Sequence, residues 1–152
     1  MKLRIEEIEQ VQIRGVRVAK PGTGTVLRRG NFEWVCFPLE TQLKTSKVVS
    51  GLLQGWHHEV YFDQVEYHED TENFYFLEGT VLMLFCDQQM ERPDMSTLRL
   101  VRIRPGTQIE VEAGKCHYVP IPETDIFKAY VFTPIQPSVM LKLSEPITLE
   151  YD

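Results

Sequence analysis

The residues best suited to chemistry lie in two stretches of the chain, Val65–Gly79 and Gly106–His117. In the first stretch, Glu66 and His68 are two positions apart, so on a strand their side chains leave the same face. Glu72 follows four residues after His68, across a polar segment where we expect the chain to bend. These spacings allow a carboxylate, an imidazole and a second carboxylate to converge.

The second stretch supplies a fourth group. Gly106 and Gly114 bracket a short expected strand, and His117 begins the next one. Two imidazoles with two carboxylates form a mixed nitrogen and oxygen donor set, which suits Mn, Fe, Ni or Zn. Such a set holds a divalent ion with open positions for substrate, as Lewis-acid catalysis requires. We therefore predict that a divalent metal ion is bound by Glu66, His68, Glu72 and His117.

These residues must be positioned by the strands around them. The sequence shows short apolar or alternating segments, separated by Gly, Pro, Asp and Asn, which is the pattern of strands and turns. Thr80–Cys86 is almost wholly apolar, which predicts burial on both faces of a strand. Gln108–Glu112 alternates, with Ile109 and Val111 on one face. The helical stripe of an amphipathic helix is missing, and only Pro93–Thr97 offers a helical turn. The expected strands are Lys2–Ile8, Val11–Val18, Asn31–Phe37, Lys47–Leu53, Glu59–His68, Asn73–Leu77, Thr80–Cys86, Leu98–Arg104, Gln108–Glu112, Cys116–Ile121, Phe127–Thr133, Met140–Leu143 and Ile147–Tyr151.

This regular series of short strands predicts an all-β fold, an antiparallel sandwich or barrel. The chain has 152 residues, without an internal repeat, a low-complexity stretch or a plausible linker. A chain of this length buries roughly 68–70% of its unfolded surface in one domain. We therefore expect a single domain over residues 1–152.

Charge and composition narrow the class of partner. The net charge of −6 and the pI near 5.3 argue against nucleic acid as a partner, because a protein surface that binds nucleic acid requires a basic patch. No apolar run approaches the roughly 20 residues of a membrane span. The opening segment MKLRIEEIEQ carries glutamates where a secretory signal has an apolar core, and the three cysteines form no disulfide framework. We expect a cytoplasmic protein that binds neither nucleic acid nor membrane.

The two stretches resemble the two motifs of the cupin family. The first family pattern is G(X)5HXH(X)3–4E(X)6G, and the second is G(X)5PXG(X)2H(X)3N. This chain departs from them at four positions, where Val60, Glu66, Glu112 and Ile121 replace Gly, His, Pro and Asn. The resemblance implies a double-stranded β-helix, the jelly-roll-like cupin barrel, with an N-terminal strand extension. The matching strings are Glu66-X-His68-(X)3-Glu72-(X)6-Gly79 and Gly106-(X)5-Glu112-X-Gly114-(X)2-His117.

Within the cupins, the chain looks most like the ureidoglycolate lyase family, also called ureidoglycolate hydrolases. That family begins its first motif with Glu-X-His, as at Glu66 and His68, and its linking segment resembles Pro93–Arg99, PDMSTLR. The opening KLRIEEIEQ also resembles the N-terminal strand of the family. The chain departs from the family where Gly114–Pro120 replaces a GxWHHP pattern, where Glu72 replaces Gln, and where Thr41–Gly55 lacks a match to the arginine that anchors the substrate.

This resemblance implies a metal-assisted carbon–nitrogen lyase, of the amidine-lyase type, that cleaves ureidoglycolate or a similar small ureido acid to glyoxylate and urea. Such a reaction needs a base, an acid and charge stabilisation. Glu66, Glu72 and Tyr118 are the candidate catalytic residues. Two alternatives stay open: a non-catalytic cupin that binds a small carboxylate or a sugar, and a metal-dependent isomerase of sugar acids. Cupins of this kind commonly pair through edge strands, so we also expect a homodimer.

Other conspicuous residues have plainer interpretations. His57 and His58 are adjacent and cannot both reach one ion, so we expect them at the surface or in a dimer interface. Cys116 should face away from His117, which argues against a nucleophilic Cys–His pair. The remaining expectations are a solvated strand surface for Arg99, Arg102 and Arg104, and a place in the core for Trp34, Trp56, Phe74, Tyr75 and Phe76.

Overall fold

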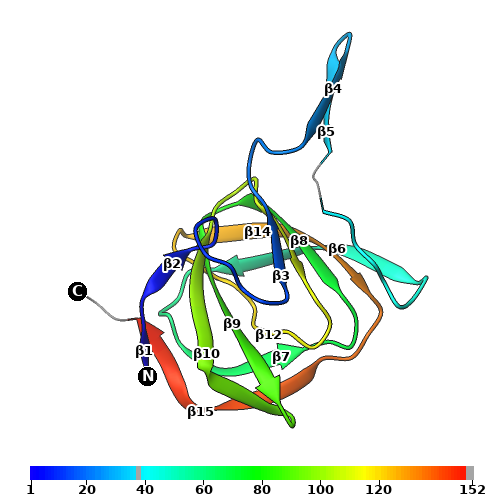
Figure 1. Cartoon of the computed structure of the whole chain (residues 1–152). Coiled ribbons are helices and arrows are strands. Elements are labelled where there is room, and N and C mark those ends of the chain that lie inside the picture. Colours follow the sequence, from blue (N-terminus) through cyan, green and yellow to red (C-terminus); the bar gives the residue numbers. More distant parts are fainter. Residues whose placement is uncertain (37–38, 150–152) are drawn as a thin grey trace.

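The computed structural model describes residues 1–36 and 39–149 and shows strands linked by turns (Figure 1). Within these residues there is no helix, and the expected helical turn at Pro93–Thr97 is wrong. This segment lies inside the strand β10 (Arg92–Ile103), where the pairing register shifts between Asp94 and Arg99. The side chain of Asp94 accepts a hydrogen bond from the backbone N–H of Ser96, which gives this group a partner at the bulge.

Eight strands form the larger sheet, in the order β1-β15-β7-β12-β9-β10-β2, with β13 paired to β9. The two N-terminal strands run parallel to their neighbours and extend both edges of this sheet, while the other pairs are antiparallel. Besides β10, its strands are β1 (Lys2–Leu3), β2 (Ile5–Glu7), β7 (Phe62–Tyr67), β9 (Val81–Gln89), β12 (Cys116–His117), β13 (Ile121–Pro122) and β15 (Val139–Leu149).

Five strands form the smaller sheet, in the order β3-β11-β8-β14-β6, all antiparallel. From β6 onwards the chain crosses repeatedly from one sheet to the other, leaving a sheet after β6, β7, β8, β10, β11, β13 and β14. Such alternation wraps the chain into a jelly-roll barrel, and it confirms the predicted all-β double-stranded β-helix. The strands are β3 (Val16–Ala19), β6 (Val48–Trp56), β8 (Glu72–Glu78), β11 (Gln108–Val111) and β14 (Ile126–Pro134).

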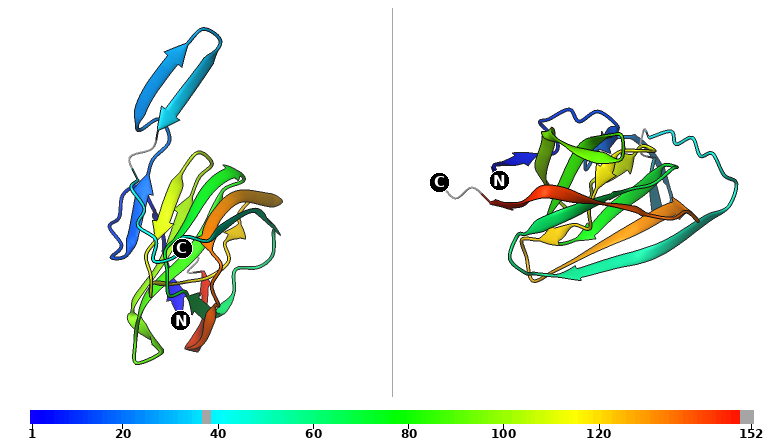
Figure 2. Two further views of the ribbon diagram at one scale, coloured as in Figure 1. Left: turned by 90° about the vertical axis from the view of Figure 1, so that its right-hand side faces the viewer. Right: turned by 90° about the horizontal axis from the view of Figure 1, so that it is seen from below.

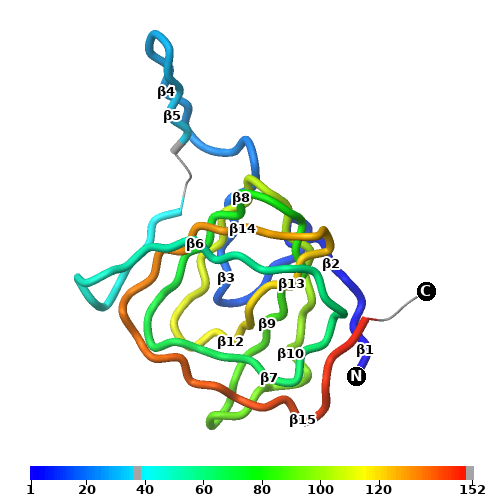
Figure 3. The backbone as a smooth tube through the Cα atoms, turned by 180° about the vertical axis from the view of Figure 1, so that it is seen from behind, coloured from blue at the N-terminus to red at the C-terminus, as the bar shows by residue number. Residues whose placement is uncertain are grey.

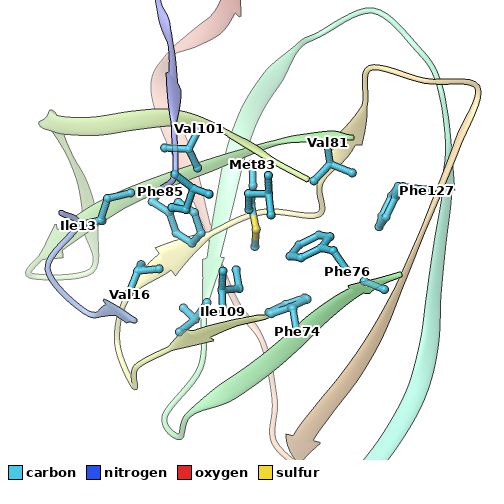
Figure 4. Packing of buried hydrophobic residues seen from close by; sticks show 14 residues of the cluster. Ile13, Val16, Phe74, Phe76, Val81, Met83, Phe85, Val101, Ile109 and Phe127 are labelled. Atoms are coloured by element: carbon cyan, nitrogen blue, oxygen red, sulfur yellow. The ribbon is translucent and has the colours of Figure 1, made fainter. Parts of the chain in front are cut away.

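The core between the two sheets is built from the inward-facing positions of both. In Figure 4, Phe76 and Ile109 from the smaller sheet point toward Met83 of β9. Ile109 and Val111 are both buried, as their alternation predicted. The opposite face of β9 is also covered, because Leu82, Leu84 and Cys86 belong to a second apolar cluster. That cluster is shared with β7, β10, β12, β13 and β15.

Every side chain from Val81 to Cys86 is at most 1% exposed, which confirms the predicted burial of this strand on both faces. The turn before it depends on Gly79, which has φ +76°. A Cβ atom at Gly79 would lie 2.2 Å from the carbonyl oxygen of Ile126. Only glycine fits this turn, as expected for the last position of the first motif.

A two-stranded hairpin of β4 (Thr25–Arg29) and β5 (Phe32–Cys36) projects from the barrel (Figures 1 and 2). Trp34 lies on this hairpin and is 62% exposed, and Trp56 at the end of β6 is 65% exposed. The expected core position of both tryptophans is therefore wrong, whereas Phe74 and Phe76 are buried. Val26, Leu27 and Phe32 of the hairpin are exposed as well.

The three arginines of β10 and the turn after it pair with the N-terminal glutamates. Arg99 bonds to Glu6, while Arg102 and Arg104 bond to Glu7. These pairs join β2 to the edge of the larger sheet. The arginines therefore hold the N-terminal strand in place, and these glutamates lie outside both Val65–Gly79 and Gly106–His117.

Candidate metal centre

Two neighbouring strands of the larger sheet bring three of the predicted ligands together. Glu66 lies near the end of β7, His68 directly follows that strand, and His117 ends β12. His117 pairs in register with Glu66, and β12 lies between β7 and β9 (Figure 3). One ligand atom from each of the three residues lies within 4.8 Å of the other two. This spacing is close enough for all three to contact one ion.

The fourth predicted ligand approaches from the other sheet. Glu72 is the first residue of β8, after the chain has crossed from β7. Its Oε2 atom lies 3.2 Å from Nε2 of His117 and 3.5 Å from Nε2 of His68. The bend expected between His68 and Glu72 is thus the crossing between the sheets. The structure brings all four predicted residues into one cluster.

Backbone carbonyl groups fix the orientation of both imidazole rings. Nδ1 of His117 donates to the carbonyl oxygen of Lys115 at 3.1 Å, and Nδ1 of His68 faces that of Pro137 at 3.3 Å. A carbonyl oxygen only accepts, so the Nδ1 atoms carry the hydrogens and both Nε2 atoms point to the cluster. This is the usual arrangement of metal-binding histidines, whose second nitrogen is held by a hydrogen bond.

Burial and charge act against each other in the cluster. Burial alone would lower the pKa of His117, but its hydrogen bond to Glu72 and the negative charges of Glu72 and Glu66 outweigh it and raise this pKa. Burial would likewise raise the pKa of Glu72, yet the hydrogen bond and charge of His117 and the charge of His68 hold it low. Without an ion, the cluster is therefore held by charge pairing across the two sheets.

The donor set fits a divalent transition metal. Two imidazole nitrogens and two carboxylates match the preferences of Mn, Fe, Ni or Zn. The carboxylate of Glu66 is half-buried and offers an oxygen atom to an ion at the cluster. An ion binds to an unprotonated imidazole nitrogen, and Nε2 of His117 is the atom that faces the cluster.

A cavity of about 390 Å³ opens beside the cluster, between the two sheets. Its volume suits a small molecule. Leu52 and Val119 line it and are 56% and 43% exposed, so the cavity reaches the surface. The full lining comprises Val49, Ser50, Gly51, Leu52, Leu53, Glu66, His68, Glu72, Phe74, His117, Tyr118, Val119, Pro120, Val131, Thr133 and Ser138.

Tyr118 lines the same cavity, but its side chain contacts Gln64 and Phe62 and not the cluster. Its hydroxyl oxygen accepts a hydrogen bond from Gln64 at 2.6 Å, and its ring packs edge-on against Phe62. The ring thus joins the second apolar cluster. The catalytic role assigned to Tyr118 stays a prediction, and Gln64 is the group that fixes its hydroxyl.

The remaining candidates lie outside the cavity lining. His57 and His58 follow the end of β6 and are both exposed. Cys116 is buried in the second apolar cluster opposite Cys86, on the other face of β12 from His117. These placements agree with the plain interpretations of the three residues.

Some functional features carried no signal in the sequence. The carbonyl groups of Lys115 and Pro137 act through the backbone, so no side-chain type marks them. Gly51 lines the cavity from β6, in a segment where the sequence offered only an apolar strand. It could have been noticed as a glycine at an inward position of a strand.

No family model and no curated protein matches this chain. Among solved structures, it is similar to RmlC from Streptococcus suis in complex with dTDP-D-xylose, with 12% identity, a TM-score of 0.49, and coverage of 88% of this chain and 70% of that one. It is also similar to a dTDP sugar isomerase from Desulfovibrio desulfuricans G20, with 10% identity, a TM-score of 0.48, and coverage of 92% and 87%. Within the described residues, no helix has the length and apolar character needed to cross a membrane.

Proposed function

We propose that the protein is a divalent-metal enzyme of the cupin type that acts on a small substrate with adjacent oxygen atoms. The observation that supports it is the convergence of two imidazoles and two carboxylates on the wall of a surface cavity. A buried cluster of titratable groups beside a cavity is typical of a reactive site. Glu66, His68, Glu72 and His117 are the residues that would hold the ion.

The carboxylates have a second use in such a site. A bound divalent ion lowers the pKa of a hydroxyl group that it contacts. Glu72 and Glu66 both lie where a substrate hydroxyl at the cluster would be within reach of a carboxylate oxygen. One of them is therefore suited to take the hydroxyl proton, while the other stays with the ion.

For the reaction itself, we propose carbon–nitrogen cleavage of ureidoglycolate or a similar ureido acid. The sequence resemblance at Glu66, His68 and Pro93–Arg99 supports this choice. In that reaction the base removes the hydroxyl proton, the C–O bond becomes a carbonyl and the C–N bond breaks. The departing nitrogen takes up a proton, so that glyoxylate and urea are released.

The test is to purify the protein, load it with Ni²⁺, Mn²⁺, Fe²⁺ or Zn²⁺ in turn, and measure glyoxylate and urea from ureidoglycolate. We expect release in equal amounts, and its loss in the double variant His68→Ala with His117→Ala. The matched control replaces the two exposed histidines, His57→Ala with His58→Ala, and should keep the activity. No release with any of the four ions would refute the lyase proposal, and equal activity of both double variants would refute this site.

A further inference from the structure

We infer that the cavity beside the cluster is a subsite for an apolar group. Among ureido acids and similar small chelators, the site would then favour a neutral or singly charged compound that carries an apolar substituent over a phosphorylated or multiply acidic one. This inference rests on the proposed metal-dependent function and adds the class of ligand.

The walls of the cavity are apolar. Val49 and Leu53 of β6, Phe74 of β8 and Val131 of β14 line it on the side of the smaller sheet. Leu53, Val131 and Phe74 also belong to the core between the sheets or pack against it. A ligand that enters the cavity therefore exchanges water for hydrocarbon, which favours an apolar group.

No lysine or arginine lines the cavity in the part of the chain that the structure describes. The five remaining residues are Phe, Pro, Glu, Tyr and Asp, so they add no cation either. Lys115 comes nearest in sequence to a ligand, but its ammonium group bonds to Asp87 at 2.8 Å. Recognition of a phosphate or a second carboxylate ordinarily uses such cations, and this cavity has none to offer.

The charge balance points the same way. The carboxylates of Glu66 and Glu72 neutralise a divalent ion between them. A singly charged ligand then leaves one negative charge in a half-buried site, and a doubly charged ligand leaves two. Each uncompensated charge in such surroundings is costly.

Gly51 gives the cavity its space. It lies on the inward face of β6, opposite Val131 on β14, and a Cβ atom there would meet no atom within 4 Å. Gly55 lies on the same face four residues further along, and there a Cβ atom would come within 2.4 Å of the ring of Phe127. Gly55 is therefore required by the packing of the core, whereas a side chain at the exposed Gly51 would enter open space at the cavity.

The experiment uses the Ni²⁺-loaded full chain and three chelators, with affinities measured by titration calorimetry and retained nickel measured after gel filtration. Acetohydroxamate and benzohydroxamate share one head group and differ in their apolar part, and oxalate carries two charges. We expect the affinity for benzohydroxamate to be at least about tenfold higher than that for acetohydroxamate, because the ring of benzohydroxamate is buried. Oxalate should bind most weakly.

The variant Gly51→Val fills the cavity from a position that tolerates a side chain, and valine suits a strand. It should abolish the preference for benzohydroxamate while leaving nickel content and acetohydroxamate affinity unchanged. Gln54→Val, on the exposed face of the same strand, is the matched control and should keep the preference. Oxalate binding as tight as benzohydroxamate, or an unchanged preference in Gly51→Val, would overturn the inference.

A metal-free arm separates the two proposals. Benzyl alcohol should give saturation-transfer NMR signals with the metal-free wild type and with Gln54→Val, and none with Gly51→Val. If nickel is not retained, the metal-dependent function fails, and this arm still decides the apolar subsite. If benzyl alcohol binds all three proteins alike or none of them, the apolar subsite is refuted.

Discussion

Oε2 of Glu72 lies 3.2 Å from Nε2 of His117, although the two residues belong to different sheets of the barrel. The cluster therefore joins the sheets on one side of the cavity, and an ion bound there should stabilise the whole fold. At a concentration one hundred times its dissociation constant, a ligand adds about 2.7 kcal/mol to the free energy of unfolding. For a chain of this size we expect a rise in Tm of about 5–10 °C on addition of the ion.

The variant Glu72→Gln keeps the shape of the side chain and removes its charge, so its rise in Tm should be at least halved. Glu69→Gln in the same turn is exposed and serves as the control, with an unchanged rise. Differential scanning calorimetry at matched ion concentrations gives the comparison. The same rise in Glu72→Gln as in the wild type would show that the ion binds elsewhere.

Burial of β9 on both faces predicts two large losses of stability from neighbouring positions. Phe85 faces the core between the sheets, and Leu84 faces the second apolar cluster. Truncation of either to alanine leaves a cavity and should cost about 2–5 kcal/mol in the free energy of unfolding by urea. Leu77→Ala, at a side chain that is 48% exposed, should cost far less. A small loss in Leu84→Ala alone would mean that the second cluster is open to water.

The motif residues and the strands around them were predictable because local pattern and long-range packing agree there. Val81–Cys86 is apolar at every position, and that pattern has one outcome, a strand covered on both faces. His68 and Glu72 lie on either side of a short polar bend, so their convergence follows from a change of sheet. The spacing of the ligands in the sequence thus predicts the change of sheet between them.

Other parts of the fold depend on long-range contacts that the local sequence pattern does not predict. Trp34 looks like a core residue, yet it lies on a hairpin that leaves the barrel. Val11–Val18 is expected as one strand, but only Val16–Ala19 forms one, because β11 offers a partner of four residues there; Ile13 makes only an isolated bridge to Val16. Gly51 opens the cavity through an absent side chain, and its meaning appears only once Val131 is seen opposite.

The pair of Asp87 and Lys115 predicts a dependence of stability on acid. Burial would raise the pKa of Asp87, but hydrogen bonds from Lys115 and Arg14 and their charges hold it below its ordinary value of 3.8. A carboxyl group whose pKa is lowered by folding stabilises the fold above its unfolded pKa and loses this contribution as pH falls through the folded value. The contribution of Asp87 is therefore complete at neutral pH, begins to fall near pH 4 and is lost as pH falls through the lowered pKa of Asp87.

The variant Asp87→Asn leaves the buried ammonium group of Lys115 without its anion, so at pH 7 it should lose about 1–3 kcal/mol in the free energy of unfolding. The difference from the wild type should shrink as pH falls from 4 to 2, measured by urea unfolding at each pH. Asp63→Asn, at an exposed position on β7, is the control. A difference that stays constant over this range would contradict the role of the charge.

The projecting hairpin predicts the oligomeric state. Leu27, Phe32 and Trp34 share one of its faces and are 49%, 54% and 62% exposed, while Arg28 and Glu33 form an ion pair on the other face. A two-stranded hairpin is marginally stable in water, and an apolar face of this kind gains stability when it is covered.

We propose that a second copy of the chain covers this face, because the smaller sheet also ends at β6, whose outer edge pairs with no other described strand and which exposes Leu52 and Trp56. Light scattering should then give twice the chain mass of 17.7 kDa at micromolar concentration. The triple variant Leu27→Ser, Phe32→Ser and Trp34→Ser should be monomeric, and Val26→Ser, on the opposite face, should stay dimeric. A monomeric wild type would refute the dimer. A dimeric triple variant would exclude the hairpin from the interface and leave the edge of β6 as the contact.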